Sequence, residues 1–411
     1  MKIERISEKQ AQILDFVVSD GLYLICDGAV RTGKTVLMTS AFIIWAMEFY
    51  DRTNFAICGK TVQSAERNVL KPLQANESLP YTMTYKISTK VLTVRCGAKE
   101  NYFYIFGGKD ESSYMLIQGI TLAGVLFDEV ALMPRSFVEQ ALSRAISYEK
   151  PKYWFNCNPD SPKHYFYKEW IENQKEGTTH LHFLLEDNPI LTEQMIERTK
   201  AMYSGVFYDR YIRGLWVMAE GIIYPMFGKD TIVPTIERKY TRYVISMDYG
   251  IQNPTAMLLW GFCDGVWYQV SEFYHSGRET NNQKADQDYY DDLERLAGDR
   301  YIDSLIIDPS ATSFIALVKQ KRRFKVRTAK NSVVDGIQKT ASAIQQGKIK
   351  VNDCCKSTIK EYGLYSWDAN ATEDRPIKDN DHAMDATRYF VNTMNIMKPK
   401  SEYNGKLAVT I

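Results

Sequence analysis

Near the start of this 411-residue chain, a short apolar run, a glycine-containing loop and a long apolar stretch follow one another without interruption. The run LYLIC predicts a buried strand, and VLMTSAFIIWAMEF, after the loop, predicts a buried helix. The loop is a complete GxxxxGK[ST] motif, formed by Gly28, Ala29, Val30, Arg31, Thr32, Gly33, Lys34 and Thr35. Because the motif has a strand before it and a helix after it, a chance match is disfavoured. We expect an α/β fold.

Such a loop binds the phosphates of a nucleotide. Its glycines allow the backbone to wrap around phosphate oxygens, so that successive N–H groups point at them. Lys34 would neutralise the β- and γ-phosphates, and the hydroxyl of Thr35 would hold Mg²⁺. We therefore expect every residue of the loop to take part in nucleotide binding.

Two adjacent carboxylates end another apolar run, AGVLFDE. Asp128 would bind the Mg²⁺ through water, and Glu129 would act as the general base that polarises water. Two solvated acids at the end of a strand are the alternative. The phosphate loop upstream favours the catalytic interpretation, and the pairing indicates hydrolysis rather than nucleotide holding alone.

Five further residues are candidates for this site. Arg31, inside the loop, would reach the γ-phosphate as an arginine finger in cis, or it is a surface arginine. Arg144 is a weaker rival that would act between subunits. Asn156 and Asn158 follow a strand and would couple hydrolysis to a moving segment, or they form a turn before a proline. Gln10, in an N-terminal helix, would read the adenine edge or has no special role.

The second half of the chain carries acidic residues beside apolar elements. Asp248 ends the run VISMD, Asp308 ends SLIID, and Asp385 lies with His382 in DNDHAMDATRYF. Three carboxylates from two strands and a helix can hold two divalent cations, Mg²⁺ or Mn²⁺, for attack on a phosphodiester. Solvated acids are the alternative, but an unneeded charge beside an apolar element is costly. His382 and Glu272 are possible extra ligands.

The chain is longer than one hydrophobic core usually serves, and its pattern changes near the middle. Strand-like runs alternate with helical stretches to about residue 185, Gly and Pro interrupt residues 214–243, and a second α/β pattern follows. The predicted divisions are a first domain at 1–215, a linker at 216–240, a second domain at 241–398 and a tail at 399–411.

Charge and cysteine content narrow the class of protein. The 51 Lys and Arg residues nearly balance 50 Asp and Glu, which excludes only a globally basic nucleic-acid binder. The run KQKRRFKVR at 319–327 either follows the backbone of bound DNA or is a solvated face.

The seven cysteines form no CxxC pair, and no apolar run reaches the roughly 20 residues that span a bilayer. We expect an intracellular protein without a membrane segment. His180 and His182 alternate on a strand without a third ligand, which favours a structural role.

The order of phosphate-loop domain, linker and acidic domain resembles the large terminase subunit of tailed bacteriophages and prophages. The segments that carry the resemblance are IQGITLAGVLFDEVALMPRSFVEQALSRA, WFNCNPDSPKHYFYKEWI, SMDYGIQNPTAMLLWG and DNDHAMDATRYF. The resemblance implies an N-terminal P-loop ATPase domain of the ASCE (RecA-like) class and an RNase H-like nuclease domain. It also implies that Arg31, Lys34, Thr35, Asp128 and Glu129 form the ATPase site. Asn158 falls in the coupling region, and Asp248, Asp308 and Asp385 are the nuclease carboxylates, with His382 beside them.

The family's function follows as an expectation. The chain would hydrolyse ATP to translocate double-stranded viral DNA into a procapsid and would cleave concatemeric DNA with a metal-dependent endonuclease. Its partners would be the small terminase subunit, the portal protein and further copies of itself in a ring, a pentamer as in similar motors. It would work in the cytoplasm of the bacterial host, transiently docked at the portal.

Other classes of protein share parts of this pattern. A helicase–nuclease of repair or defence would need a second RecA-like half, where this chain has carboxylates instead. A nucleotide-switched DNA-binding adaptor with an inactive nuclease fold would not need Glu129 or a complete acidic trio. An integrase or transposase would share the acidic site but would not need the phosphate loop.

Overall fold

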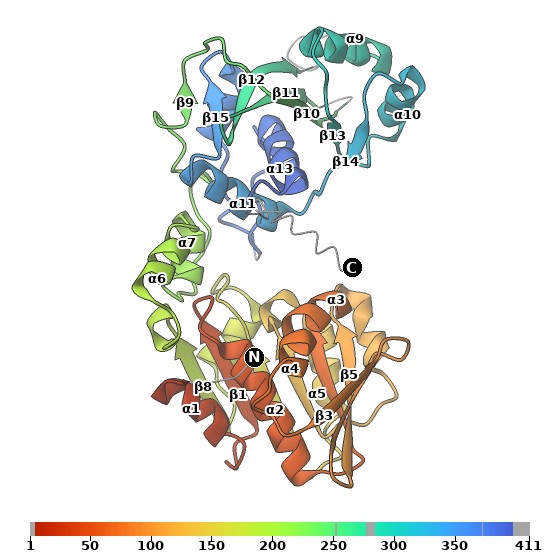
Figure 1. Ribbon diagram of the computed structural model, residues 1–411, viewed down its shortest axis with the longest axis vertical. Coiled ribbons are helices and arrows are strands. Elements are labelled where there is room, and N and C mark those ends of the chain that lie inside the picture. The colour runs from red at the N-terminus through yellow and green to blue at the C-terminus, as the bar shows by residue number, and fades with distance from the viewer. Residues whose placement is uncertain (1–4, 251–252, 277–283, 372, 398–411) are drawn as a thin grey trace, which may run out of the picture. The chain divides into compact units, whose positions relative to one another are not determined.

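The computed structural model describes residues 5–250, 253–276, 284–371 and 373–397. The predicted tail, 399–411, lies outside them. The chain divides into two compact units (Figure 1). The first runs through Lys200 and includes Val206–Met218, and the second comprises Ala201–Gly205 and the chain from Ala219 onward.

An eight-stranded sheet forms the centre of the first unit, in the order β3-β4-β5-β2-β6-β7-β1-β8. From β5 to β8 all neighbours are parallel, whereas β3 and β4 extend the sheet as an antiparallel hairpin. The strands are β1 (Tyr23–Gly28), β2 (Asn54–Gly59), β3 (Thr82–Lys86), β4 (Val91–Cys96), β5 (Lys99–Gly107), β6 (Gly124–Asp128), β7 (Lys152–Asn156) and β8 (Thr178–Phe183).

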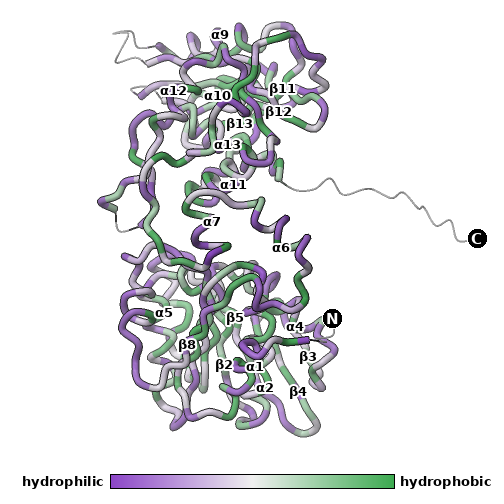
Figure 2. Tube along the Cα trace, turned by 90° about the vertical axis from the view of Figure 1, so that its left-hand side faces the viewer, coloured by the Kyte–Doolittle hydropathy of each residue, from purple (hydrophilic) through white to green (hydrophobic). Residues whose placement is uncertain are grey.

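Helices lie against this sheet, and the longest of them follows the phosphate loop. They are α1 (Glu8–Asp15), α2 (Lys34–Phe49), α3 (Val62–Ala65), α4 (Lys71–Gln74) and α5 (Arg135–Ser143), with π-helical segments at Glu66–Leu70 and Tyr167–Glu172. Two further helices, α6 (Glu193–Lys200) and α7 (Gly205–Tyr211), follow β8 in the chain. Most of α2 is buried, as its continuous apolar sequence predicts, because it packs with α1 against the sheet. In Figure 2 hydrophobic stretches mark the interior of each unit.

A seven-stranded mixed sheet forms the centre of the second unit, in the order β14-β13-β10-β11-β12-β15-β9. The strands β10, β11 and β12 form an antiparallel meander, and parallel strands flank it on both sides. The strands are β9 (Ile232–Val233), β10 (Arg242–Asp248), β11 (Thr255–Cys263), β12 (Val266–His275), β13 (Leu305–Ile307), β14 (Val326–Thr328) and β15 (Ile349–Asn352).

Helix α13 (His382–Met394) lies across the middle of this sheet and is buried along most of its length. Its Phe390 ring stacks on Trp260 of β11, with 4.3 Å between ring centroids. The other helices are α9 (Asp286–Ala297), α10 (Thr312–Lys321), α11 (Val333–Gln345) and α12 (Lys356–Tyr362). Both units are therefore mixed α/β, which confirms the predicted fold class.

The predicted linker, 216–240, contains residues that take part in the folded units. Trp216 donates a hydrogen bond to Asp27 in the first unit, and β9 joins the edge of the second sheet beside β15. The exact domain limits stay a prediction. Among the described helices, none has the length and apolar character needed to cross a bilayer.

Candidate active sites

The phosphate loop connects β1 to α2, and its backbone is fixed at both ends. Gly28 has φ of +119°, and a Cβ there would lie 2.1 Å from the carbonyl oxygen of Phe183, so only glycine fits. The N–H groups of Ala29 and Val30 donate to the carbonyls of Phe183, at 2.7 Å, and Tyr211, at 2.9 Å. The loop is therefore preformed by contacts with β8 and with the end of α7.

Lys34 is 5% exposed and points back into the loop. Its Nζ donates to the carbonyl of Ala29 at 2.6 Å and lies 3.3 Å from both the carbonyl of Gly28 and the hydroxyl of Thr32. Burial lowers the pKa of Lys34, and the charge of Glu129 opposes this shift. Because its hydrogen-bond partners are neutral oxygens, the buried ammonium is suited to an anionic ligand such as a phosphate group.

Asp128, at the end of β6, meets Thr35 and Asn156. The register of the sheet places Asp128 directly beside Asn156 of β7. The hydroxyl of Thr35 lies 3.2 Å from the Asp128 carboxylate, and Asn156 Nδ2 donates to the carboxylate at 2.7 Å and to the hydroxyl at 2.8 Å. Burial, together with the neighbouring charge of Glu129, raises the pKa of Asp128. A hydroxyl beside a desolvated carboxylate is a donor set that fits Mg²⁺.

Glu129 and Asn158 lie near Lys34. Asn158 Nδ2 lies 3.3 and 3.4 Å from the two carboxylate oxygens of Glu129, and Lys34 Nζ lies 3.4 Å from Asn158 Oδ1. One amide thus bridges the predicted base and the predicted phosphate-binding lysine. The backbone of Glu129 is left-handed, with φ of +61°, a conformation that costs a non-glycine residue about 1–3 kcal/mol. Strain of this kind is typical of functional sites.

Arg31 and Gln10 also lie at the loop. Arg31 has φ of +60°, its side chain is exposed, and its carbonyl accepts a hydrogen bond from Asn188. Gln10 is buried, and its Nε2 donates to the carbonyl of Thr32 at 2.8 Å while its Oε1 accepts from the N–H of Ser7. Gln10 therefore supports the loop in this structure. The finger role of Arg31 and adenine recognition by Gln10 stay predictions.

A buried carboxylate that was not predicted stabilises the base of the loop. Asp27, the residue before Gly28, is 1% exposed. Its Oδ1 lies 2.9 Å from His180 and from His182 of β8, and its Oδ2 accepts from Trp216 Nε1 at 2.7 Å. The two histidines thus have the structural role that their spacing predicts. Their alternation on one strand was the available signal, because it implies a shared partner on the neighbouring strand.

Replacing Asp27 with asparagine should lower the free energy of unfolding of the first unit by about 3–5 kcal/mol. Burial alone would raise the pKa of Asp27, but hydrogen bonds from His180 and His182 outweigh it and hold the pKa well below its ordinary value. The stabilisation is therefore fully present above about pH 4 and is lost as the pH falls toward the folded-state pKa.

Urea unfolding followed by tryptophan fluorescence at pH 7 and at pH 3 measures this contribution. Asp20→Asn is the matched control, because the Asp20 side chain is 96% exposed and its contact with Lys150 is a surface pair. A pH 7 unfolding free energy of Asp27→Asn within about 0.5 kcal/mol of the control, the noise of a surface change, would contradict the prediction.

In the second unit, the sheet register brings two predicted carboxylates to one edge. Met247 of β10 is paired with Ile307 of the parallel strand β13. Asp248 and Asp308 each come one residue later, so both lie where these neighbouring strands end. Helix α13 begins beside this edge, and Glu361 fixes its first turn by accepting hydrogen bonds from the N–H groups of residues 383 and 384.

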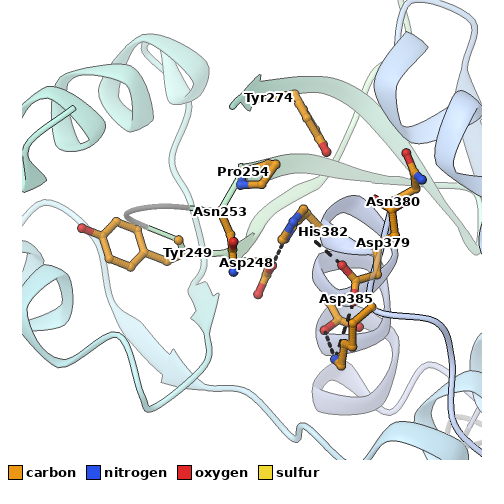
Figure 3. A pocket seen from close by; sticks show the side chains of 12 residues that line it. Asp248, Tyr249, Asn253, Pro254, Tyr274, Asp379, Asn380, His382 and Asp385 are labelled. Atoms are coloured by element: carbon orange, nitrogen blue, oxygen red, sulfur yellow. Dashed lines mark hydrogen bonds and ion pairs between the residues drawn. The ribbon is translucent and has the colours of Figure 1, made fainter. Parts of the chain in front are cut away.

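A cavity of about 380 Å³ opens at this edge. Its lining includes Asp248, Lys378, Asp381, His382 and Asp385. Figure 3 shows His382 reaching from the start of α13 toward Asp248, with Asp385 on the following turn; His382 Nδ1 lies 2.9 Å from Asp248 Oδ2. Burial, reinforced by the charge of Asp385, raises the pKa of Asp248 even though His382 opposes this shift. Asp381 and Lys378 were not predicted; the spacing of Asp381 from Asp385, one helical turn, was the available signal.

Asp308 and Glu272 are held by other partners. Asp308 accepts hydrogen bonds from the N–H of Ser310 and from Asn331 Nδ2, both at 2.9 Å, and is not among the lining residues of the cavity. Glu272 accepts from the N–H groups of Ser357 and Thr358, so its carboxylate caps the start of α12.

Within the described residues, no three His, Cys, Asp or Glu side chains form a ready metal-binding cluster. The chemistry of the lining nevertheless fits a divalent cation. Four aspartates, Asp248, Asp379, Asp381 and Asp385, line one polar cavity, and hard oxygen ligands of this kind suit Mg²⁺ and Mn²⁺. Burial and the charge of Asp385 also raise the pKa of Asp381, which a bound cation would reverse.

A phosphate loop with an acidic pair in one α/β unit, and an acidic cavity in a second, define a two-domain protein with a P-loop domain and an RNase H-like domain. Family models match both parts. "Terminase large subunit, T4likevirus-type, N-terminal" matches residues 25–228, and "Terminase RNaseH-like domain" matches residues 250–393.

Solved structures match over nearly the whole length of the chain. The large terminase of a thermophilic bacteriophage is 48% identical, with a TM-score of 0.91 over 95% of this chain and 100% of that one. The same phage protein in complex with ATP-gamma-S is matched at 47% identity and a TM-score of 0.88, with the same coverage of both chains. The chain therefore belongs to the large terminase subunit family of bacteriophages, the DNA-packaging ATPase/nuclease family, which confirms the resemblance.

Curated relatives are more distant. The large terminase subunit of Escherichia phage T5 is 24% identical over 299 residues, which cover 66% of this chain and 65% of that protein. The large subunit of Salmonella phage P22 is 23% identical over 307 residues, which cover 69% of this chain and 59% of that protein. The match thus spans about two thirds or less of the length of these relatives.

Proposed function

We propose that this chain is the motor subunit of a viral DNA-packaging machine. It hydrolyses ATP to translocate double-stranded DNA into a procapsid and cleaves concatemeric DNA with its second domain. The observation that carries the proposal is the separation of two sites on one chain: a phosphate loop with a general-base candidate in one unit and an acidic cavity in the other. A motor that must both pull and cut needs both sites.

In the first domain, each residue has an assigned task. Lys34 turns from the carbonyls of its own loop to the β- and γ-phosphates of ATP, while Thr35 and Asp128 hold the Mg²⁺ that offsets the phosphate charge. Glu129 accepts a proton from water. Asn158, which contacts both Lys34 and Glu129, changes partners between nucleotide states and so couples hydrolysis to movement.

Arg31 serves as the arginine finger of the same subunit, and Gln10 supports both the loop and the adenine. Asn156 keeps Thr35 and Asp128 aligned. The structures of the thermophilic phage terminase with ADP and with ATP-gamma-S support a nucleotide at this site, since those chains are 47% identical to this one over 95% of its length.

In the second domain, Asp248, Asp308 and Asp385 hold two divalent cations, which supply Lewis-acid activation of the phosphodiester and of the attacking water. His382 orients Asp248 through its Nδ1 contact, and its Nε2 faces Asp381 at 3.8 Å, from where it can join the metal site. The partners we propose are the small terminase subunit, the portal protein and further copies of this chain in a pentameric ring. The chain works in the host cytoplasm and at the portal.

The purified chain should show both activities. We expect phosphate release from ATP with Mg²⁺, and nicking or linearisation of supercoiled plasmid with Mn²⁺ or Mg²⁺ in the absence of nucleotide; EDTA should abolish both. Phosphate release without metal-dependent cleavage would reduce the chain to a nucleotide-driven adaptor. Cleavage without ATP hydrolysis would leave a nuclease with no motor.

A further inference from the structure

A buried arginine lies one helical turn after Asp385. Arg388 is 2% exposed, and its Nη2 donates to Asp385 Oδ1 at 2.8 Å, with Nε 3.3 Å from the same oxygen. The other carboxylate oxygen, Oδ2, faces Lys378 of the cavity at 3.9 Å. Arg388 therefore occupies one oxygen of Asp385 and leaves the other for a ligand in the cavity.

The other side of the same guanidinium contacts the segment between β14 and α11. Arg388 Nη1 donates to the carbonyl of Asn331 at 2.7 Å and to that of Ser332 at 3.1 Å. The Asn331 side chain donates to Asp308 Oδ2 at 2.9 Å. A continuous chain of contacts thus runs from Asp385 through Arg388 and Asn331 to Asp308.

Neighbouring contacts hold this segment along α13. Asn392 Nδ2 donates to the carbonyl of Lys330 at 3.0 Å, and the N–H of Lys330 donates to Thr393 Oγ1 at 2.9 Å. Gly336 of α11 makes room for the arginine, since a Cβ at this position would lie 2.5 Å from Arg388 Cγ. The packing around Arg388 therefore fixes where its guanidinium can lie.

We propose that Arg388 is a positioning residue of the nuclease site. Through Asn331 it sets the placement of Asp308 relative to Asp385, so that both carboxylates can serve the same pair of divalent cations. Only a planar guanidinium meets Asp385 and two carbonyls at once; an ammonium has neither the span nor the fixed geometry. This inference rests on the proposed nuclease function.

The test is binding of Mn²⁺ to the full chain, measured by calorimetry without nucleotide or DNA. Arg388→Lys and Asn331→Ala should each weaken Mn²⁺ binding by about 10–100-fold, as expected for groups that orient metal ligands. The double variant should lose no more than the worse single variant, since both changes break the same chain of contacts. Arg242→Lys is the matched control, because Arg242 pairs with Asp303 at the surface of the same unit.

Plasmid cleavage gives a second measure of Mn²⁺ binding. The Mn²⁺ concentration for half-maximal plasmid cleavage should rise by the same factor in both variants, while the rate at saturating Mn²⁺ recovers. The melting temperature of each variant in EDTA measures whether it is folded. Because Asn331 is exposed, Asn331→Ala still tests the inference if Arg388→Lys is unstable. Mn²⁺ affinity in Asn331→Ala equal to that of wild type, or additive losses in the double variant, would overturn the inference. A wild type that binds no Mn²⁺ and cuts no DNA would overturn the proposed nuclease as well.

Discussion

Glu129→Gln should reduce ATP hydrolysis by about 10²–10⁴-fold, the usual contribution of a general base, and should leave nucleotide binding and DNA cleavage in place. The substitution keeps the size of the side chain and its contact with Asn158 but removes the ability to accept a proton. It also removes a negative charge near Lys34, so binding of ATP-gamma-S should be as tight as in wild type or tighter.

Phosphate release at saturating ATP, with a fluorescence assay of ATP-gamma-S binding, measures the two effects separately. Glu139→Gln is the control, because the Glu139 side chain is exposed on α5, where it pairs with Arg135. Hydrolysis by Glu129→Gln at more than a tenth of the wild-type rate would show that another group activates the water. A loss of binding instead would indicate that Glu129 is needed to shape the loop.

Asp308→Asn should reduce metal-dependent plasmid cleavage by more than about 100-fold, since even residues that only orient metal ligands contribute about 10–100-fold. Asparagine keeps the shape of the side chain but removes the charge that a divalent cation needs. Burial opposes ionisation of Asp308, yet hydrogen bonds from Ser310 and Asn331 hold its pKa below its ordinary value, so the carboxylate is charged at neutral pH and ready for a cation.

Asp303→Asn is the control for this variant, because Asp303 precedes the same strand and makes only a surface pair with Arg242. ATP hydrolysis should be unchanged in Asp308→Asn, as cleavage should be in Glu129→Gln. Wild-type cleavage by Asp308→Asn would remove Asp308 from the metal site, and its hydrogen bonds with Ser310 and Asn331 would then be purely structural.

Much of the fold follows from local sequence patterns. Buried parallel strands are continuous apolar runs, and the strands after the phosphate loop were predicted for this reason. The antiparallel hairpin β3–β4 was not, because β3 alternates between exposed and partly buried positions and only two residues of β4 are buried, so neither strand is a continuous apolar run. The site residues at strand ends were predictable, since parallel strands bring their carboxyl ends to one edge.

Contacts between distant segments could not be predicted in the same way. The partners of Asp27 lie more than 150 residues away, and Arg388 meets a loop 56 residues before it. Nothing in the local pattern distinguishes such residues from solvated charges. They appear only when the packing shows that the charge is buried and which groups neutralise it.

In the phosphate loop, the N–H of Val30 donates a hydrogen bond to the carbonyl of Tyr211. The neighbouring Asp27 accepts a hydrogen bond from Trp216. Both partners belong to the last stretch of the first unit, which ends at Met218, where the chain passes into the second unit for the rest of its length. In mechanical terms the loop and this stretch form a stiff linkage, because two short hydrogen bonds, of 2.9 and 2.7 Å, hold them together. In the motor function proposed above, a force generated at the γ-phosphate would therefore reach the point where the chain leaves the domain with little elastic loss.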